Sequence, residues 1–385
     1  MLDGLRVLEI SSFVAAPLGG MTLAQLGAEV IRVDPIGGAP DVRRWPLAPS
    51  GASLYWAGLN KGKRSVTVDL RSPRGREIVS ALAADTGVVL TNAPRPSYEE
   101  LAAARPDLIH LRIEGHHDGR PAVDYTVNAE TGFPLATGPE DHTDPVNNVV
   151  PAWDIACGLY AAVGILAAER HRSRTGEGSA LRLPLADVAL ATAGNLGLLG
   201  AAVLGGGDRP RIGNHLYGGF ARDFATADGE RVMLVTLTAR HFADLCAVTG
   251  LAEVFTELGR LLGADFGADA DRYRHREAIA ALIEPWFAAR TLAEVSKALS
   301  GCSVLWSPYR TFTEAARAAT ANPLMTELDQ PGIGRHPVPG SPIVSGAGRG
   351  AALAPALGSD TDDVLTEIGL DAGEIVALRG EGIVA

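Results

Sequence analysis

The stretch "VVPAWDIACGLYAAVGILAAERHRSRTGEG", residues 149–178, places the carboxylate of Asp154 directly before a long apolar segment with helical composition. An Asp in that position is a favoured N-cap, because its oxygen accepts hydrogen bonds from unpaired backbone N–H groups. The same N–H groups and the helix dipole favour an ionised carboxylate. An ionised carboxylate on a rigid helix end can attack an acyl group as a nucleophile. The residue pattern leaves both roles of Asp154 open.

A second candidate site is the basic run "NKGKRSVTVDLRSPRGR", residues 60–76, in which Asp69 is the only acid. Its basic residues are Lys61, Lys63, Arg64, Arg71, Arg74 and Arg76. Lysine and arginine bind phosphate oxygens, so this run can mark a polyphosphate site. A solvated edge of the protein carries the same composition. Charge alone favours neither interpretation.

Three other kinds of chemistry lack their motifs. No Gly-x-Gly-x-x-Gly follows the first expected strand, so Asp34, placed where an NAD-binding acid would lie, is a weak signal. No Gly-x-Ser-x-Gly of an α/β-hydrolase occurs. The adjacent histidines of "GHHDG", residues 115–119, would point to opposite faces of a strand, which favours a polar loop over a metal site.

The composition limits the classes of partner and compartment. The chain has 385 residues and a net charge of −11, which argues against nucleic acid and anionic membranes as partners. The three cysteines form no Cys-x-x-Cys pair, as expected in a reducing cytoplasm. The apolar stretch Ile155–Ala168 is too short to span a bilayer. We expect a soluble, cytoplasmic protein.

The elements that must position these residues alternate between strands and helices in the first half of the chain. Apolar runs predict strands at 5–10, 29–34, 65–70, 87–92 and 108–115. Helical spacing is found at 17–27 and 73–85, between these strands. This alternation predicts an α/β fold with a parallel, doubly wound sheet.

The second half of the chain has a different pattern. "GGGDRP", residues 205–210, predicts a flexible break, and "FARDFATADGERVMLVTL" predicts a hairpin around Asp228-Gly229. Helices follow to about residue 300, and a Gly/Pro-rich stretch at 331–359 precedes a final helix at 360–369. We therefore expect a large domain at 1–205, a smaller α+β domain at 215–325, and a linker and C-terminal segment at 331–385 that returns to the large domain.

Five stretches, taken together, resemble family III CoA-transferases. They are "LDGLRVLEISSFVAAPLGGMTLAQLGAEVIRVDPIGG", "NKGKRSVTVDL", "VDYTVNAETGFPLATG", "WDIACGLYAAVGILAAERHRSRTGEG" and "LGSDTDDVLTEIGL". They run almost end to end in the order of that family. The resemblance implies a Rossmann-like large domain, a small α+β domain, and an interlocked homodimer with its active site where the domains meet. It also implies an acyl-CoA thioester as substrate, and no metal or cofactor beyond the CoA that the substrate carries.

The resemblance carries site residues onto this sequence. The catalytic aspartate of the family corresponds to Asp154. The CoA contacts correspond to Val14, Ala15, Val68, Asp69, Leu70, Arg71, Asn92, Ala93, Pro94, Arg120, Pro121, Ala122, Val123 and Asp124. Where the family often has an arginine after the second strand this chain has Pro35, so Arg43 or Arg44 must supply that charge. The racemases of the family have a histidine near Val123, and its absence here argues against racemisation.

A narrower group of stretches resembles members of the family that move CoA between the two carboxyl groups of one dicarboxylic acid. These are "FVAAPLGGMTLAQLGAEVIRVDPIGG", "RRWPLAPSGASLYWAGLNKGKRS", "PAWDIACG" and "RPRIGNHLYGGFARDF". Asp154 would then form an acyl anhydride and an aspartyl-CoA thioester in turn, and the turn Tyr217-Gly218-Gly219 is a candidate oxyanion donor. The alternatives are an intermolecular CoA-transferase and a non-catalytic acyl-CoA-binding protein.

Overall fold

The computed structural model describes residues 1–205, 207–343 and 350–385. The chain forms two compact units: unit 1 comprises 1–131, 148–201 and 318–385, and unit 2 comprises 132–147 and 202–317. The segment 132–147 thus clusters with unit 2, although it lies within the predicted large domain. The predicted domain boundaries remain predictions. The expected joints at 205–210 and 331–359 each include residues outside the described ranges.

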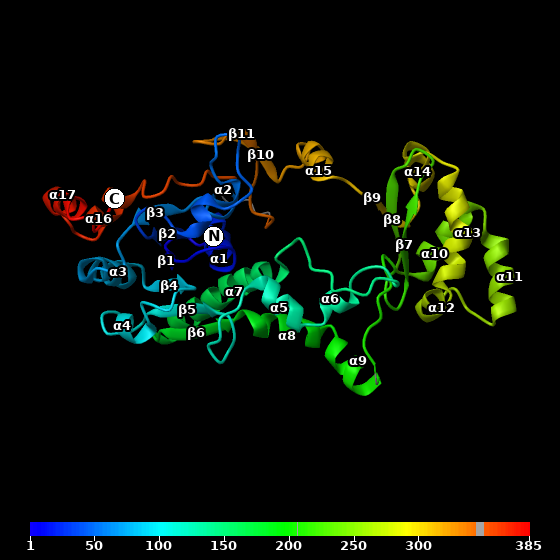
Figure 1. Ribbon diagram of the computed structural model, residues 1–385, viewed down its shortest axis with the longest axis horizontal. Helices are drawn as coiled ribbons and strands as arrows, with labels where there is room; N and C mark the ends of the chain where they lie inside the picture. Colours follow the sequence, from blue (N-terminus) through cyan, green and yellow to red (C-terminus); the bar gives the residue numbers. More distant parts are fainter. Residues whose placement is uncertain (206, 344–349) are drawn as a thin grey trace. The chain divides into compact units, whose positions relative to one another are not determined.

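Unit 1 is built on a six-stranded parallel sheet with the order β3-β2-β1-β4-β5-β6 (Figure 1). The strands are β1 (Arg6–Ile10), β2 (Glu29–Asp34), β3 (Arg64–Thr67), β4 (Val88–Thr91), β5 (Ile109–Glu114) and β6 (Ser179–Pro184). The predicted parallel α/β fold is confirmed. β6 was not predicted, because this edge strand is half-exposed and carries no continuous apolar run. The strand order reverses between β1 and β4, and in such sheets ligands bind beyond the carboxyl ends of the strands at that point.

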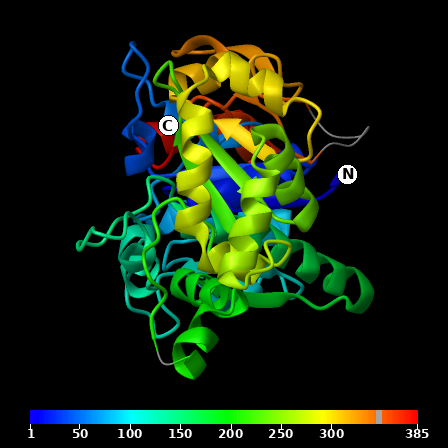
Figure 2. The ribbon, with the colours of Figure 1, turned by 90° about the vertical axis from the view of Figure 1, so that its right-hand side faces the viewer.

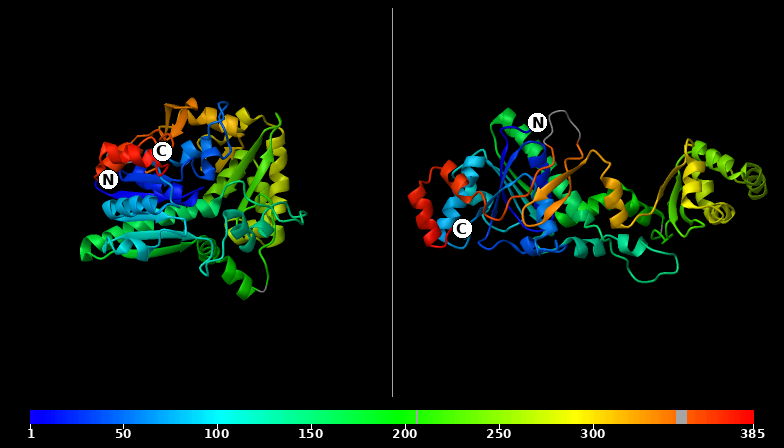
Figure 3. Two further views of the ribbon diagram at one scale, coloured as in Figure 1. Left: turned by 60° about the vertical axis from the view of Figure 1, so that its left-hand side comes forward. Right: turned by 90° about the horizontal axis from the view of Figure 1, so that it is seen from above.

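Helices cover both faces of this sheet (Figure 3). Successive strand residues point to opposite faces, so Leu8 and Val89 pack with α3, α4, α16 and α17, whereas Leu90 faces α1. The helices of unit 1 are α1 (Ala15–Gln25), η1 (Pro40–Arg43), α2 (Leu54–Leu59), α3 (Pro73–Thr86), α4 (Tyr98–Ala102), α5 (Asp124–Glu130), α7 (Ala152–Thr175), α8 (Leu185–Asn195), α16 (Thr361–Glu367) and α17 (Ala372–Gly380). α9 (Leu198–Gly205) and α15 (Phe312–Ala319) span the unit boundaries.

Glycines bring the start of α7 against the start of α1. A Cβ atom at Gly158 would lie 2.6 Å from the carbonyl oxygen of Ala15, and one at Gly19 would lie 3.0 Å from the carbonyl oxygen of Gly158. Only residues without a side chain permit so close a contact between two helix backbones. The N-terminal parts of α1 and α7 are thereby fixed side by side.

Gly158→Ala is expected to lower the free energy of unfolding by about 1–3 kcal/mol, because the added methyl group overpacks a contact with backbone atoms. Urea unfolding followed by circular dichroism measures the change. Gly200→Ala is the control: Gly200 is in α9 with no atom within 4 Å of its added Cβ, and alanine there should be neutral or stabilising. Equal effects of the two substitutions would contradict the packing argument.

α7 is long and apolar enough, by length and composition, to cross a membrane, as is the bent pair of α8 and α9. Within unit 1, however, α7 buries one side, which includes Cys157, Ala161 and Ile165. Burial of this kind is what the core helix of a globular domain shows.

Unit 2 contains a three-stranded antiparallel sheet with the order β7-β8-β9, and helices that pack against it (Figures 1 and 2). The hairpin predicted around Asp228-Gly229 is confirmed, with Phe220 paired with Thr236. Stacked and edge-to-face phenylalanines fill its core. The elements of unit 2 are α6 (Phe133–Ala136), β7 (Phe220–Ala225), β8 (Arg231–Thr236), α10 (Ala239–Thr249), α11 (Ala252–Leu262), α12 (Asp269–Arg274), α13 (Arg276–Ala288), α14 (Leu292–Leu299) and β9 (Leu305–Pro308).

The C-terminal part of unit 1 contains a hairpin that was not predicted, formed by β10 (Met325–Gln330) and β11 (Gly334–Pro339). Its strands are mostly polar and part of it lies in the Gly/Pro-rich stretch, so the pattern of alternating apolar residues is missing. The predicted final helix is confirmed as α16, and α17 follows it.

Candidate active site

The predicted CoA contacts lie on loops that follow the carboxyl ends of the parallel strands of unit 1. Val14 and Ala15 follow β1 and residues 92–94 follow β4, so these two groups flank the point where the strand order reverses. Residues 68–71 follow β3, residues 120–123 lie between β5 and α5, and Asp124 begins α5. Parallel strands bring all of these loops to one edge of the sheet, where α/β proteins bind their ligands.

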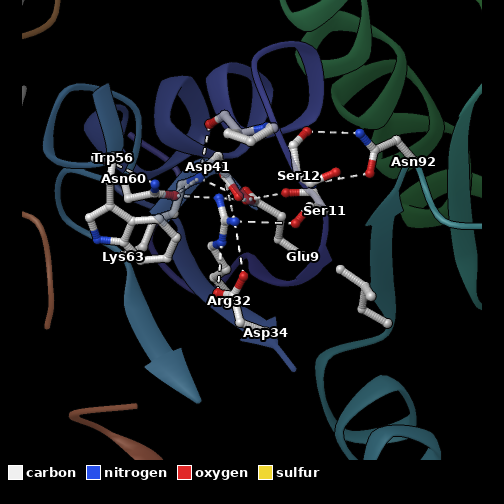
Figure 4. Close-up of polar contacts among 12 residues, drawn as sticks. Glu9, Ser11, Ser12, Arg32, Asp34, Asp41, Trp56, Asn60, Lys63 and Asn92 are labelled. Atoms are coloured by element: carbon white, nitrogen blue, oxygen red, sulfur yellow. Dashed lines mark hydrogen bonds and ion pairs between the residues drawn. The ribbon is translucent and has the colours of Figure 1, made fainter. Parts of the chain in front are cut away.

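The side chain of Asn92 forms hydrogen bonds that hold two loops together at this edge. The backbone N–H of Ser12 donates to Asn92 Oδ1 (3.1 Å), and Asn92 Nδ2 donates to the carbonyl oxygen of Ser12 (2.8 Å; Figure 4). The amide therefore ties the end of β4 to the turn between β1 and α1. Asn92 positions the backbone near Val14 rather than offering a free amide to a ligand.

A buried ionic cluster lies beneath the same edge (Figure 4). Arg32 donates to both oxygens of Asp34 (2.9 and 3.0 Å) and to Asp41 Oδ2 (2.9 Å), and it lies 4.3 Å from the ring centre of Trp56. Because Asp41 is in η1, this contact fixes η1 and the residues after it against β2. The carboxylate of Asp34 is fully engaged by Arg32 and fully buried, so it cannot bind a ribose as an NAD-binding acid does.

The basic run at 60–76 divides into a buried and an exposed part. Lys63 is buried and donates to Glu9 Oε1 (2.8 Å), and Arg64 forms ion pairs with two glutamates. These side chains therefore neither bind phosphate nor form a solvated edge, because ion pairs hold their charges inside unit 1. Arg71, by contrast, is 95% exposed. Arg71 therefore remains a candidate phosphate ligand, whereas the lysine-rich start of the run does not.

A cavity of about 560 Å³ adjoins Arg71. Its lining consists of Pro35, Ile36, Asp69, Leu70, Arg71 and Gly382. Three predicted CoA contacts thus meet at one cavity, together with the proline that replaces the arginine common in the family. Sequence reasoning missed Gly382, which lies more than 300 positions away in the chain and carries no local signal.

The structure corrects the interpretation of Asp154 as an N-cap. α7 begins at Ala152, so Asp154 is its third residue, and its side chain makes no capping hydrogen bond among the described residues. The cap comes from Asp124, whose Oδ2 accepts from the backbone N–H groups of Trp153 (2.8 Å) and Asp154 (3.1 Å). Asp124 lies on α5 and is 6% exposed. Its carboxylate fixes the helical turn that carries Asp154.

The expectation that the helix end favours ionisation of Asp154 is also corrected. Burial raises the pKa of Asp154 to about 6, the like charge of Asp124 adds to the rise, and Arg44 opposes it. Desolvation and the like charge of Asp124 therefore disfavour ionisation of Asp154 at this helix end. At pH 7.5 the carboxyl group is still ionised, and it has few donors to stabilise its charge. A carboxylate in that state is suited to nucleophilic attack.

Two residues act electrostatically with Asp154: Arg44, which the sequence had offered together with Arg43 as a source of positive charge, and Tyr55, which had no signal in the sequence. The guanidinium of Arg44 lies 5.2 Å from the ring centre of Tyr55 and 5.4 Å from that of Phe13. Burial raises the pKa of Tyr55 to about 12, and the charge of Asp154 contributes to that rise. Phe13 has a φ of +67°, which is rare for a bulky residue and indicates local strain. Arg43 and Arg44 are both exposed, but Arg43 donates to the carbonyl oxygen of Gly37 (3.1 Å), whereas the charge of Arg44 acts on the pKa of Asp154.

Within the described part of the chain, no three His, Cys, Asp or Glu side chains gather in a way that could hold a metal ion. The first turn of α7 offers the partly buried carboxylate of Asp154, whose pKa is raised and on which the charge of Arg44 acts, at the ligand-binding edge of a Rossmann-like sheet. This arrangement can carry out acyl transfer through a covalent carboxylate intermediate.

Residues 2–361 match the model of CoA-transferase family III, and the chain belongs to this family. It is 50% identical over 400 residues to the 2-methylfumaryl-CoA isomerase of Chloroflexus aurantiacus, with 100% of this chain and 98% of the relative covered. It is 28% identical over 403 residues to the succinyl-CoA:glutarate CoA-transferase of Mus musculus, covering 100% and 90% of the two chains.

Among solved structures, a CAIB/BAIF family protein from Brucella suis superposes with a TM-score of 0.78 at 26% identity, over 95% of this chain and 99% of that one. The family resemblance inferred from the sequence is thereby confirmed. The role of Asp154 and the CoA contacts remain predictions.

Proposed function

We propose that this protein moves CoA from one carboxyl group of mesaconate (2-methylfumarate) to the other, as a 2-methylfumaryl-CoA isomerase does. The observation that carries the proposal is the 50% identity to that isomerase over the full length of both proteins. The partly buried carboxylate of Asp154, on which the charge of Arg44 acts, supports it, since CoA transfer of this kind needs an ionised nucleophile.

The reaction proceeds through two covalent states of Asp154. Its carboxylate attacks the thioester carbonyl, which forms an acyl anhydride and releases the CoA thiolate. The thiolate attacks the aspartyl carbonyl, giving an aspartyl-CoA thioester and free mesaconate. The second carboxylate of mesaconate then attacks this thioester and releases the thiolate again. Attack of the thiolate on the mesaconyl carbonyl gives the isomeric ester and restores Asp154.

The residues around Asp154 have separate tasks in this scheme. Asp124 holds the first turn of α7, and the positive charge of Arg44 offsets the developing oxyanion. The loops after β1, β3, β4 and β5 bind CoA, with Arg71 available for its phosphates. CoA arrives with the substrate, and the scheme needs no other cofactor and no metal.

The working form is an interlocked homodimer in the cytoplasm. The outer side of α7 supports an interface of this kind, because Leu159, Tyr160 and Val163 are each about half-exposed or more. The net charge of −11 disfavours nucleic acid and anionic membranes as further partners.

An isotope experiment tests the proposal against intermolecular transfer. The protein is incubated with unlabelled mesaconyl-CoA in a large excess of labelled free mesaconate, and the product esters are weighed by mass spectrometry. We expect unlabelled product, because enclosure makes the second attack effectively unimolecular and dissolved acids compete poorly. Label in proportion to the pool would instead indicate an intermolecular transferase, the activity named for the mouse relative. Absence of any isomeric ester would contradict the proposal.

A non-catalytic acyl-CoA-binding protein is the remaining alternative. It would have no use for a nucleophile, whereas the raised pKa of Asp154 marks a carboxylate kept in a costly environment. The same incubation decides this point, since a binding protein would return only the starting ester.

A further inference from the structure

The cavity beside Arg71 has one wall that comes from the C-terminal residues of the chain. The other lining residues belong to the loops after β2 and β3, and Gly382 completes the lining. No part of the scheme above uses residues 382–385. Their contacts show how they reach the cavity.

The C-terminal residues are joined to the end of β3 by backbone pairing. Val384 forms an antiparallel bridge with Val68, and the backbone N–H of Asp69 donates to the carbonyl oxygen of Ile383 (2.8 Å). The hydroxyl of Thr67 donates to the carbonyl oxygen of Ala385 (2.8 Å). Val384 is only 1% exposed. The segment is therefore built into unit 1, and it holds the loop that carries Arg71.

Gly382 keeps space open at the cavity. Its φ is +71°, a conformation that glycine adopts freely and that asparagine tolerates better than most residues. A Cβ atom added at Gly382 would meet no atom within 4 Å. A longer side chain at this position would occupy volume that the cavity now leaves empty.

The chemistry of the cavity suits the nucleotide half of CoA. Pro35, Ile36 and Leu70 offer apolar surface for a base, and Ile36 is 42% exposed although it is hydrophobic. The exposed guanidinium of Arg71 can pair with phosphate oxygens in a fork. A 3′-phospho-ADP group presents one flat base and several phosphates, which matches this combination.

We propose that residues 382–385 are part of the CoA site: Gly382 forms a wall of the cavity for the 3′-phospho-ADP group, and its lack of a side chain leaves room for that group. The inference rests on the proposed function only in taking the ligand to be a CoA ester. It assigns a binding role to the end of the chain, which lies far in sequence from every other predicted CoA contact.

The test compares Gly382→Asn with a matched control, Gly369→Asn. Gly369 also has a positive φ (+97°) and open space at its Cβ position, but it lies between α16 and α17 and does not line the cavity. Isothermal calorimetry with 3′,5′-ADP, the nucleotide half of CoA, gives a readout that does not depend on turnover. We expect Gly382→Asn to weaken binding about tenfold or more, and Gly369→Asn to bind as the unsubstituted protein does.

Kinetics provide a second readout. Gly382→Asn should raise KM for mesaconyl-CoA with little change in kcat, because the nucleotide binds ground and transition states alike. Mesaconyl-pantetheine lacks the nucleotide, so its kcat/KM should be the same for the variant and the unsubstituted protein. An equal loss with both substrates would overturn the proposal.

If Gly382→Asn fails to fold, amide hydrogen exchange of the unsubstituted protein provides the test instead. In the unsubstituted protein, 3′,5′-ADP should slow exchange at residues 382–384, and unchanged exchange there would overturn the inference. If 3′,5′-ADP binds in a Gly382-dependent way but no CoA is transferred, the proposed function fails and the inference stands. If CoA is transferred but 3′,5′-ADP binding does not depend on Gly382, the inference fails and the function stands.

Discussion

Asp154→Asn is expected to abolish CoA transfer while the protein remains folded. An amide cannot form the acyl anhydride, so turnover of mesaconyl-CoA should fall by roughly four to six powers of ten. Initial rates measured by separating the two mesaconyl-CoA isomers give the loss, and circular dichroism reports folding. A variant that retains substantial activity would contradict the assignment of Asp154 as the nucleophile.

The same substitution should stabilise the protein at neutral pH. The pKa of Asp154 is about 6 in the folded protein and about 3.9 in an unfolded chain. The folded state therefore binds the proton more tightly, and the free energy of unfolding falls as pH rises from about 4 to about 6. Above pH 6 the charge on the partly buried Asp154 costs about 2–3 kcal/mol, which Asp154→Asn removes.

Urea unfolding at pH 7.5 and at pH 4 measures this effect. The variant should be the more stable protein at pH 7.5, and the difference should disappear near pH 4. Asp363→Asn, at an exposed position in the first turn of α16, is the control and should change neither activity nor stability appreciably. A residue that only capped α7 would show the opposite sign, a loss of about 1 kcal/mol with activity kept.

Two substitutions of Asp124 should distinguish its role as a cap of α7 from the effect of its charge on Asp154. Asp124→Ala leaves the N–H groups of Trp153 and Asp154 without their acceptor, so the free energy of unfolding should fall by about 1–2 kcal/mol. Because Asp154 lies on that turn, a small displacement should lower kcat about a hundredfold. Rates and urea unfolding of the same preparation measure both effects.

Asp124→Asn keeps an acceptor oxygen and removes the like charge near Asp154. The pKa of Asp154 should then fall, so the acid limb of the kcat/KM profile, near pH 6 in the unsubstituted protein, should move to lower pH. Activity at pH 7.5 should fall much less than in Asp124→Ala. If both substitutions raise only KM for mesaconyl-CoA, Asp124 is a CoA contact, as the family resemblance implies, and not a positioning residue.

The sequence by itself determined the family and most of the sheet of unit 1. Strands such as β1 and β2 are continuous apolar runs, and the hairpin at Asp228-Gly229 has a local turn signal, so short windows were enough to predict them. β6 and the β10–β11 hairpin were not predicted, because their half-exposed strands lack such a pattern. The motif around Asp154 was also sufficient to nominate the nucleophile, which remains a prediction.

Only the tertiary structure decided the surroundings of Asp154 and of the nucleotide cavity. Asp124 caps α7 from a different helix, the charge of Arg44, the residue after η1, acts on Asp154, and Gly382 reaches the cavity because Val384 pairs with Val68, directly after β3. None of these contacts has a local signal, because each joins segments that are distant in the chain. The pKa of Asp154 is also set by tertiary structure. The sequence suggested that a helix end would favour ionisation of the carboxylate, but burial, which depends on packing, raises its pKa instead, and the charge of Asp124 adds to the rise.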